Sequence, residues 1–131
     1  MEQILLAFSD PQDWERLLVA RENARDVDGM SALYERYASL DHGGGKLIHV
    51  RGAIHRFFAE LIVTAQKFEM GVQRAAMVCG DLALTSTQCP NGTVTAEVAR
   101  RQSDGMWLWV IDPFSIATEA TGLAQGDQPR T

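Results

Sequence analysis

His42 is the residue of this sequence most suggestive of acid–base chemistry. A histidine titrates near neutral pH and can act as a general base when a carboxylate orients its ring. Asp41 is its neighbour in the chain, and Asp112 is a second carboxylate that could take this role, so all three are candidate catalytic residues. In the alternative interpretation, which we favour, His42 is a solvated side chain in a glycine-rich turn at 41–45.

Asp112 also has a functional and a structural interpretation. Strict alternation along the last expected strand places it on the face opposite Trp107 and Trp109. In the functional interpretation it is a buried carboxylate inside a pocket. In the structural one, which we favour, it pairs with Arg100 or Arg101 across a hairpin, or it accepts backbone N–H groups at the strand end.

The remaining histidines and the cysteines do not support a metal site. His49 and His55 flank the start of an expected helix without a tight ligand spacing. Cys79 and Cys89 are expected at opposite ends of one hairpin, beyond the ~7 Å between Cα atoms that a disulfide allows. We therefore expect no metal, no cofactor, and two reduced, buried thiols.

Large aromatic side chains could line a pocket for a flat, apolar ligand. The candidates are Trp14, Tyr34, Phe58, Trp107 and Trp109. In the alternative they belong to the core and to a dimer interface, where such side chains concentrate. We expect some of these five side chains to line the pocket and the others to lie in the core or the dimer interface.

Three helices are expected to position these residues. Ser9 or Asp10 can cap the first helix, and Pro11 suits its first turn. Its apolar face is expected to hold Trp14, Leu17, Leu18 and Ala24. The charged residues expected elsewhere on it are Glu15, Arg16, Glu22 and Arg25.

A second, shorter helix follows a break at 26–29. Its inward residues are expected to be Met30, Leu33, Tyr34 and Tyr37. The third helix, 54–65, is the clearest, because its apolar residues follow the spacing of a wide helical stripe. It comes after a short hairpin whose strands are 38–40 and 46–50.

From residue 67 the apolar period changes to two, which predicts strands. The turns between them are expected at 80–81, 91–92 and 103–105. This order predicts an α+β fold in which helices cover the concave side of a curled, mostly antiparallel sheet. Such a half-closed cone leaves a pocket at its wide end.

Length and charge indicate one globular domain, expected over residues 1–117 with a mobile tail at 118–131. The net charge is −5 and the basic residues are scattered, which disfavours nucleic acid as a partner. No apolar run approaches the roughly 18 residues that span a bilayer, and the first eight residues do not resemble a signal peptide. We therefore expect a cytoplasmic protein.

Four stretches resemble the NTF2-like superfamily, specifically its SnoaL-like and DUF4440-like branch. They lie at 25–34, 50–58, 80–84 and 99–113, in the order of that family, although Val50 stands where the family usually has glycine. The resemblance implies a cone-shaped, cystatin-like fold and a homodimer through the open sheet face. It does not imply one function, since the superfamily contains ketosteroid isomerases, polyketide cyclases, dehydratases, limonene epoxide hydrolases and non-catalytic association domains.

Ketosteroid isomerase chemistry is disfavoured, because the resemblance puts His42 near the expected base and Leu18 at the expected tyrosine. The main hypothesis is a dimeric protein with a pocket for a small, largely apolar molecule. A cofactor-independent acid–base enzyme, such as a cyclase, dehydratase or isomerase, is the alternative. A protein-association module is a third possibility and would need an apolar patch beyond the dimer face.

Overall fold

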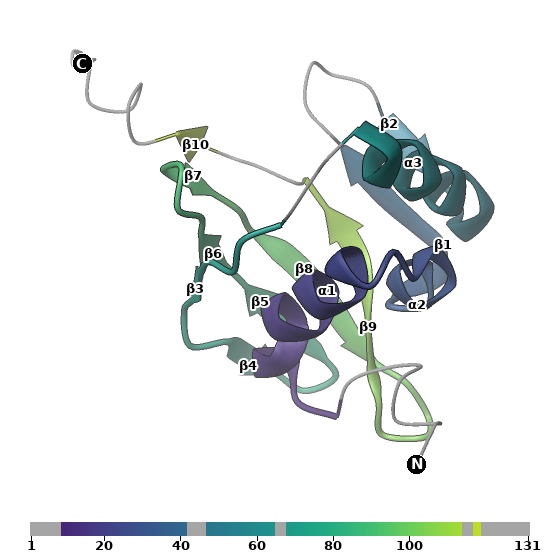
Figure 1. Ribbon diagram of the computed structural model, residues 1–131. Helices are drawn as coiled ribbons and strands as arrows, with labels where there is room; N and C mark the ends of the chain where they lie inside the picture. Colours follow the sequence, from purple (N-terminus) through teal and green to yellow (C-terminus); the bar gives the residue numbers. More distant parts are fainter. Residues whose placement is uncertain (1–8, 42–46, 65–67, 114–116, 119–131) are drawn as a thin grey trace.

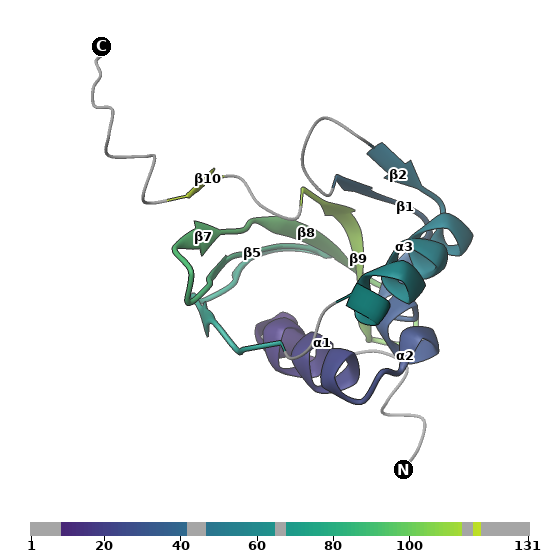
Figure 2. The same cartoon turned by 45° about the horizontal axis from the view of Figure 1, so that its top comes forward.

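The computed structural model describes residues 9–41, 47–64, 68–113 and 117–118. Three helices lie on the concave side of a curled sheet, as the tilted view in Figure 2 shows. The sheet is mostly antiparallel, which confirms the predicted α+β class. His42 and residues 119–131 of the predicted tail lie outside the described residues.

Short acidic side chains cap the 3₁₀ turn before the first helix and the start of the second helix. The Asp10 carboxylate accepts the backbone N–H of Gln12 at 2.9 Å before a 3₁₀ turn, Pro11–Asp13, and α1 (Trp14–Asn23) follows directly. Asp26 caps α2 (Val27–Ser31) by accepting the N–H of Gly29 at 2.9 Å. The third helix, α3 (Arg51–Thr64), matches the predicted apolar stripe.

The main sheet has six strands in the order β2-β1-β9-β8-β5-β4 (Figure 1). Their bounds are β1 Tyr34–Asp41, β2 Leu47–His49, β4 Met77–Cys79, β5 Leu82–Thr85, β8 Glu97–Arg101 and β9 Trp107–Asp112. All neighbours are antiparallel except β1 and β9, which pair in parallel. A second sheet, in the order β10-β7-β6-β3, consists of β3 Val72–Gln73, β6 Thr87–Gln88, β7 Thr93–Val94 and β10 Ala117–Thr118.

The two sheets are joined because both arms of one long hairpin bend. Ser86 separates β5 from β6, and Thr95 with Ala96 separates β7 from β8. The Ser86 hydroxyl donates to the carbonyl of Thr95 at 2.7 Å, so the bends lie opposite each other. The far end of the hairpin thereby turns over α1 and closes the cone.

The hydrophobic core fills the space between the helices and the concave face. Trp14 of α1 packs on Trp109 of β9 with ring centroids 4.7 Å apart, and Tyr34 packs on Phe58 at 5.8 Å. Each of these four side chains is at most 4% exposed. These contacts join α1 to β9 and α3 to β1, so helices and sheet share one core.

Two strand predictions need correction. Tyr34 begins β1 instead of continuing α2, because α2 ends at Ser31 and Trp109 donates its N–H to the carbonyl of Leu33 at 2.8 Å. Tyr37 is consequently 67% exposed, not inward. The strand expected from residue 67 is divided into the short strands β3 and β4.

A β-bulge reverses the predicted facing of Asp112. Val98 lies opposite Ile111 and the next residue, Ala99, lies opposite Trp109, so β9 has one extra residue between these pairs. Asp112 is therefore buried on the same side as Trp109, whereas Ile111 is 51% exposed. Strict alternation gave the opposite result.

Both cysteines are free thiols. Cys89 is half-buried, but Cys79 is exposed, contrary to the expectation of two buried thiols. No described helix has the length and apolar character needed to span a membrane.

Candidate functional site

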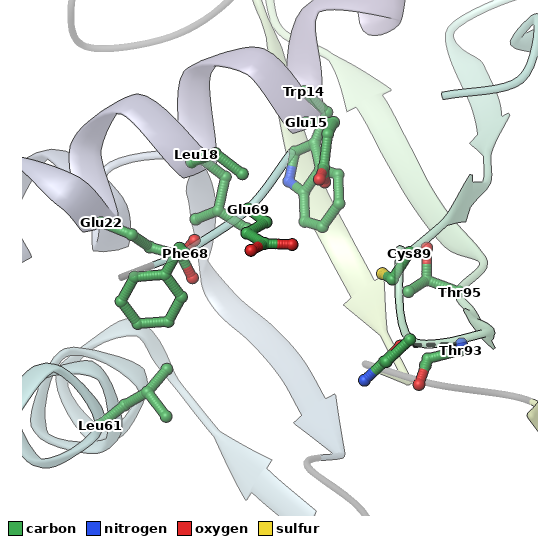
Figure 3. A pocket seen from close by; sticks show the side chains of 12 residues that line it. Trp14, Glu15, Leu18, Glu22, Leu61, Phe68, Glu69, Cys89, Thr93 and Thr95 are labelled. Carbon is green, nitrogen blue, oxygen red and sulfur yellow. Dashed lines mark hydrogen bonds between the residues drawn. The ribbon is translucent and has the colours of Figure 1, made fainter. Parts of the chain in front are cut away.

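A cavity of about 290 Å³ lies between α1, the segment after α3 and the far end of the bent hairpin (Figure 3). Its lining residues are Trp14, Glu15, Leu18, Val19, Glu22, Leu61, Phe68, Glu69, Cys89, Asn91, Thr93 and Thr95. Most of this surface is apolar, and three of its side chains are carboxylic acids.

Helix α1 contributes most of one wall. Trp14, Leu18 and Glu22 are four residues apart, and this spacing keeps side chains on one side of a helix. Glu15 and Val19 follow the same four-residue spacing beside them. Because this side of α1 faces the curled sheet, Glu15 and Glu22 are each only 7% exposed.

The two glutamates of α1 differ in their hydrogen bonding. Glu15 Oε2 accepts the backbone N–H of Gly71 at 2.8 Å. Burial raises the pKa of the Glu15 carboxyl, and the bond from Gly71 partly offsets this. The Glu22 side chain has no hydrogen-bond partner within the described part of the chain. Burial, followed by the charges of Glu15 and Asp112, raises the pKa of Glu22 to about 8.

Two further acids lie behind the cavity, on the sheet. Glu97 Oε1 accepts the Thr85 hydroxyl at 2.6 Å. Burial and then the charge of Asp112 raise the pKa of Glu97 to about 8, although nearby threonine hydroxyls lower it. The Tyr34 hydroxyl donates to Asp112 Oδ2 at 2.6 Å, and burial with this negative neighbour raises the pKa of Tyr34 well above its usual value.

The buried carboxyl groups influence one another electrostatically. Glu22 responds to the charges of Glu15 and Asp112, and Glu97 responds to the same two residues. Like charges in a low-dielectric interior cannot all ionise without a large cost. Glu22 and Glu97 are therefore mainly protonated at neutral pH. In this protonated form each can donate a hydrogen bond or a proton.

The cavity wall formed by the described residues contains no lysine, arginine or histidine. Arg21, which is buried on α1, turns toward α2 and donates Nη1 to the carbonyl of Gly29 at 2.6 Å. Among the residues with described positions, no three His, Cys, Asp or Glu side chains are grouped so that they could hold a metal ion.

The structure describes two of the three predicted catalytic residues, Asp41 and Asp112. His42 lies outside the described residues, and Asp41, at the end of β1, is not among those that line the cavity. Asp112 is buried next to Glu22 and is bonded to Tyr34. Arg100 pairs with Glu35 at 2.9 Å, and Arg101 pairs with Asp81 at 2.8 Å.

Of the five predicted pocket aromatics, Trp14 lines the cavity. The other four belong to the hydrophobic core: Tyr34, Phe58, Trp107 and Trp109. The aromatic ring that joins Trp14 at the cavity is Phe68, from the segment after α3.

Sequence reasoning missed Glu15, Glu22 and Glu97. Glu15 and Glu22 were expected away from the apolar face, but they are seven residues apart and share a side with Leu18. The seven-residue spacing between Glu15 and Glu22 was the signal in the sequence that could have placed both on the side of the helix that carries Leu18. Glu97 lies directly opposite Thr85 in the paired strands, and the alternation of threonine and acid there marks a polar inner face.

The sequence matches no protein-family model and has no significant match among curated proteins. Solved structures do resemble it. A proposed dehydratase of the NTF2-like family from Streptomyces avermitilis is 17% identical, with a TM-score of 0.61 over 73% of this chain and 86% of that one. An NTF2-like protein with a cystatin-like fold from Novosphingobium aromaticivorans is also 17% identical, with a TM-score of 0.60 over 86% and 82%.

A proposed calcium/calmodulin-dependent protein kinase type II association domain from Thiobacillus denitrificans is 19% identical. Its TM-score is 0.64, covering 82% of this chain and 94% of that one. At these identities the similarity shows a shared fold, and the functions of the similar proteins differ.

Proposed function

This chain has the NTF2-like, cystatin-like fold, and we propose that it binds a small, largely apolar molecule in the cavity beside α1. The observation that carries this proposal is the cavity itself, about 290 Å³ with a mainly apolar wall. Ligand sites are typically concave and apolar, with a few polar groups that fix orientation. Leu18, Leu61 and the rings of Trp14 and Phe68 supply the apolar part, and Glu22 supplies the polar group.

A bulky residue at the mouth of the cavity tests this proposal. Thr93 lines the cavity from β7, and its backbone N–H and carbonyl keep their hydrogen bonds in a Thr93→Trp variant. Titration with indole, a small neutral aromatic probe, is followed by NMR chemical shifts. The expected result is at least about tenfold weaker binding to the variant.

The matched control is Val72→Trp, because Val72 is 72% exposed on β3 of the same sheet, is separated from β7 by β6, and does not line the cavity. This control should bind indole like the wild type. Equal binding by all three proteins, or shifts that do not involve the cavity, would contradict the proposed site.

A second candidate function is a cofactor-independent acid–base enzyme of the dehydratase, isomerase or cyclase type. The observation that favours it is the Glu22 carboxyl, which faces the cavity with a pKa raised to about 8. An acid with such a pKa can deliver a proton at neutral pH. Glu15 is the neighbouring acceptor, and Asp112 would act through Glu22, whose pKa its charge raises.

Deuterium exchange separates binding from catalysis. The protein is incubated with 4-phenylbutan-2-one in D₂O, and exchange at the carbons beside the carbonyl is followed by NMR. An acid–base enzyme should accelerate exchange, and Glu22→Gln should reduce the acceleration about a hundredfold. Glu60, exposed on α3 and outside the cavity wall, is changed to Gln as the control. A rate equal to that of buffer counts against this candidate for carbonyl substrates.

We also propose a homodimer through the outer face of the sheet. Met77, Leu84, Val98 and Ile111 lie directly opposite one another on successive strands and form an outer apolar row. Met77, Leu84 and Ile111 are 69, 43 and 51% exposed. A second copy of the chain, with the same row, would cover these side chains.

A further inference from the structure

The carboxyl groups of the cavity are more than an apolar ligand needs. Glu15, Glu22 and Glu69 contribute three acids to the wall, whereas none of the described wall residues is basic. Burying a carboxyl group without a partner is unfavourable, so a site for a purely apolar molecule gains nothing from it. The presence of these acids therefore indicates which kind of ligand the cavity binds.

Glu22 is the most informative of the three. It is 7% exposed, lines the cavity, and has no hydrogen-bond partner within the described ranges. Figure 3 shows its carboxyl group beside the ring of Phe68. Glu15, in contrast, is held by Gly71 at 2.8 Å, and Glu69 is exposed. The open hydrogen-bonding position of this site is thus next to Glu22, whose carboxyl group can accept a donor from a ligand and can lose its proton when that ligand is a cation.

The electrostatic surroundings of Glu22 favour a donor that is positively charged. The groups whose electrostatics are linked to Glu22 are Glu15 on its own helix, Asp112 on β9, Tyr34 on β1 and Cys89 on the hairpin, and Glu69 after α3 lines the same cavity. Each of these is neutral or negative. The neighbouring cation on α1, Arg21, is not part of the cavity wall and donates to the carbonyl of Gly29 instead. A cation entering the cavity is attracted by all of the ionised acids, whereas a carboxylate or phosphate ligand is repelled.

The shape of the site favours an organic ammonium group over a metal ion. In the described part of the chain the acids do not converge as metal ligands do. An ammonium group needs no such convergence, since it can donate to Glu22 alone. It is also stabilised by aromatic faces, and the rings of Trp14 and Phe68 belong to the same wall.

We propose that the ligand of this cavity is an amine, bound as its ammonium form with the charged nitrogen at Glu22 and an aromatic or branched apolar group against Trp14, Leu18, Leu61 and Phe68. This inference rests on the proposed binding function and names the class of molecule that the same cavity takes. The ammonium ion replaces the donor that Glu22 lacks, and its charge offsets that of the acids around it.

Three probes of similar size test the proposal on the unmodified protein: benzylamine, benzyl alcohol and benzoate. They share a phenyl ring and differ in charge. Isothermal titration calorimetry at pH 7 should give benzylamine the tightest binding, about tenfold or more over benzyl alcohol, with benzoate weakest. Equal affinities, or tighter binding of the alcohol or of benzoate, would overturn the amine assignment while leaving the cavity as a binding site.

Proton release gives an independent readout. Glu22 is mainly protonated in the free protein at pH 7, since its pKa is about 8. An ammonium ion beside it lowers that pKa, so binding should release up to about one proton, measured by calorimetry in buffers of different ionisation enthalpy. Benzyl alcohol should release none. Release of no proton with benzylamine contradicts contact with Glu22.

Glu22→Gln is the variant expected to lose both effects. It keeps the size of the side chain, so benzyl alcohol should bind nearly as before, while benzylamine loses about tenfold and releases no proton. Glu60→Gln, an exposed change on α3 outside the cavity wall, should retain the preference. If none of the three probes and no indole binds the wild-type protein, the proposed function fails with the inference. If indole or benzyl alcohol alone binds, the inference alone fails.

Discussion

At the scale of single residues, the buried carboxyl groups differ in how their burial is compensated. Glu15 has a backbone N–H, Glu97 has the Thr85 hydroxyl, and Asp112 has the Tyr34 hydroxyl at 2.6 Å. These three hydrogen bonds have a structural role, because each stabilises a buried carboxyl group inside the fold. Glu22 is the exception, and it is the one that lines the cavity without a bond from the described chain.

The Tyr34–Asp112 hydrogen bond should contribute measurably to stability. Tyr34→Phe removes a buried donor to a carboxyl group, and it should reduce the free energy of unfolding by about 1–3 kcal/mol. Urea denaturation measures this change. Tyr37→Phe is the control, because Tyr37 is 67% exposed, and it should stay within about 0.5 kcal/mol of the wild type. Equal stability of the two variants would show that the bond adds nothing.

At the scale of elements, the two glycines inside helices should respond oppositely to alanine. A Cβ at Gly29 in α2 would overlap Oδ2 of the Asp26 carboxylate, whose other oxygen, Oδ1, caps the helix, and would lie 3.0 Å from Arg21 Cδ. Gly29→Ala should therefore destabilise the protein by about 1 kcal/mol or more, through loss of the cap.

Gly52 in α3 is the matched control, since a Cβ there meets nothing within 4 Å. Gly52→Ala should stabilise the protein by about 0.5–1 kcal/mol, because alanine is the better helix former. Thermal melting of both variants checks the pair. A shift of the same sign in both would contradict the structural account of the Asp26 cap.

Local signals predicted those elements whose determinants are local. The cap at Asp10 and the stripe of α3 depend on neighbouring residues, and both are present. The resemblance also placed Val50 where glycine is usual, and Val50 has a φ of +73°, a conformation that favours glycine. The sequence alone thus indicated a backbone conformation that favours glycine at residue 50.

The candidate site was predicted poorly, because its determinants are not local. The bulge in β9 depends on the register with β8 and turns Asp112 inward against strict alternation. Glu15 accepts its hydrogen bond from Gly71, 56 residues further along the chain, and Glu22 is influenced by the still more distant Asp112. Charged residues on a helix are ordinarily assigned to solvent. The cavity arises from the packing of these distant parts.

At the scale of the whole molecule, the buried acids should make stability depend on pH. The pKa values of Glu22 and Glu97 rise from 4.5 to about 8 on folding, so the folded protein holds these protons more tightly than the unfolded chain. Their contribution is fully present below pH 4.5 and is lost as the pH rises toward 8.

Urea unfolding at pH 5.5 and 8.5 should therefore show lower stability at the higher pH, by an amount on the order of a few kcal/mol. Glu22→Gln removes one of the two groups and should flatten the dependence. Glu69→Gln, at an exposed position, should keep the wild-type slope. A wild-type stability that rises over this range would show that the two acids ionise freely inside the fold.

The outer apolar row should decide the oligomeric state. Leu84 lies between Met77 and Val98 near the middle of this row, and an arginine there would place a charge in the centre of an apolar interface. Sedimentation equilibrium at micromolar concentration should give the wild type twice the 14.5 kDa mass of one chain and give Leu84→Arg the mass of a single chain.

Val63→Arg is the control, because Val63 is 81% exposed on α3, away from the sheet, and it should remain dimeric. Circular dichroism confirms that each variant is folded. A monomeric wild-type protein would contradict the dimer, and a dimeric Leu84→Arg variant would place the interface on another surface.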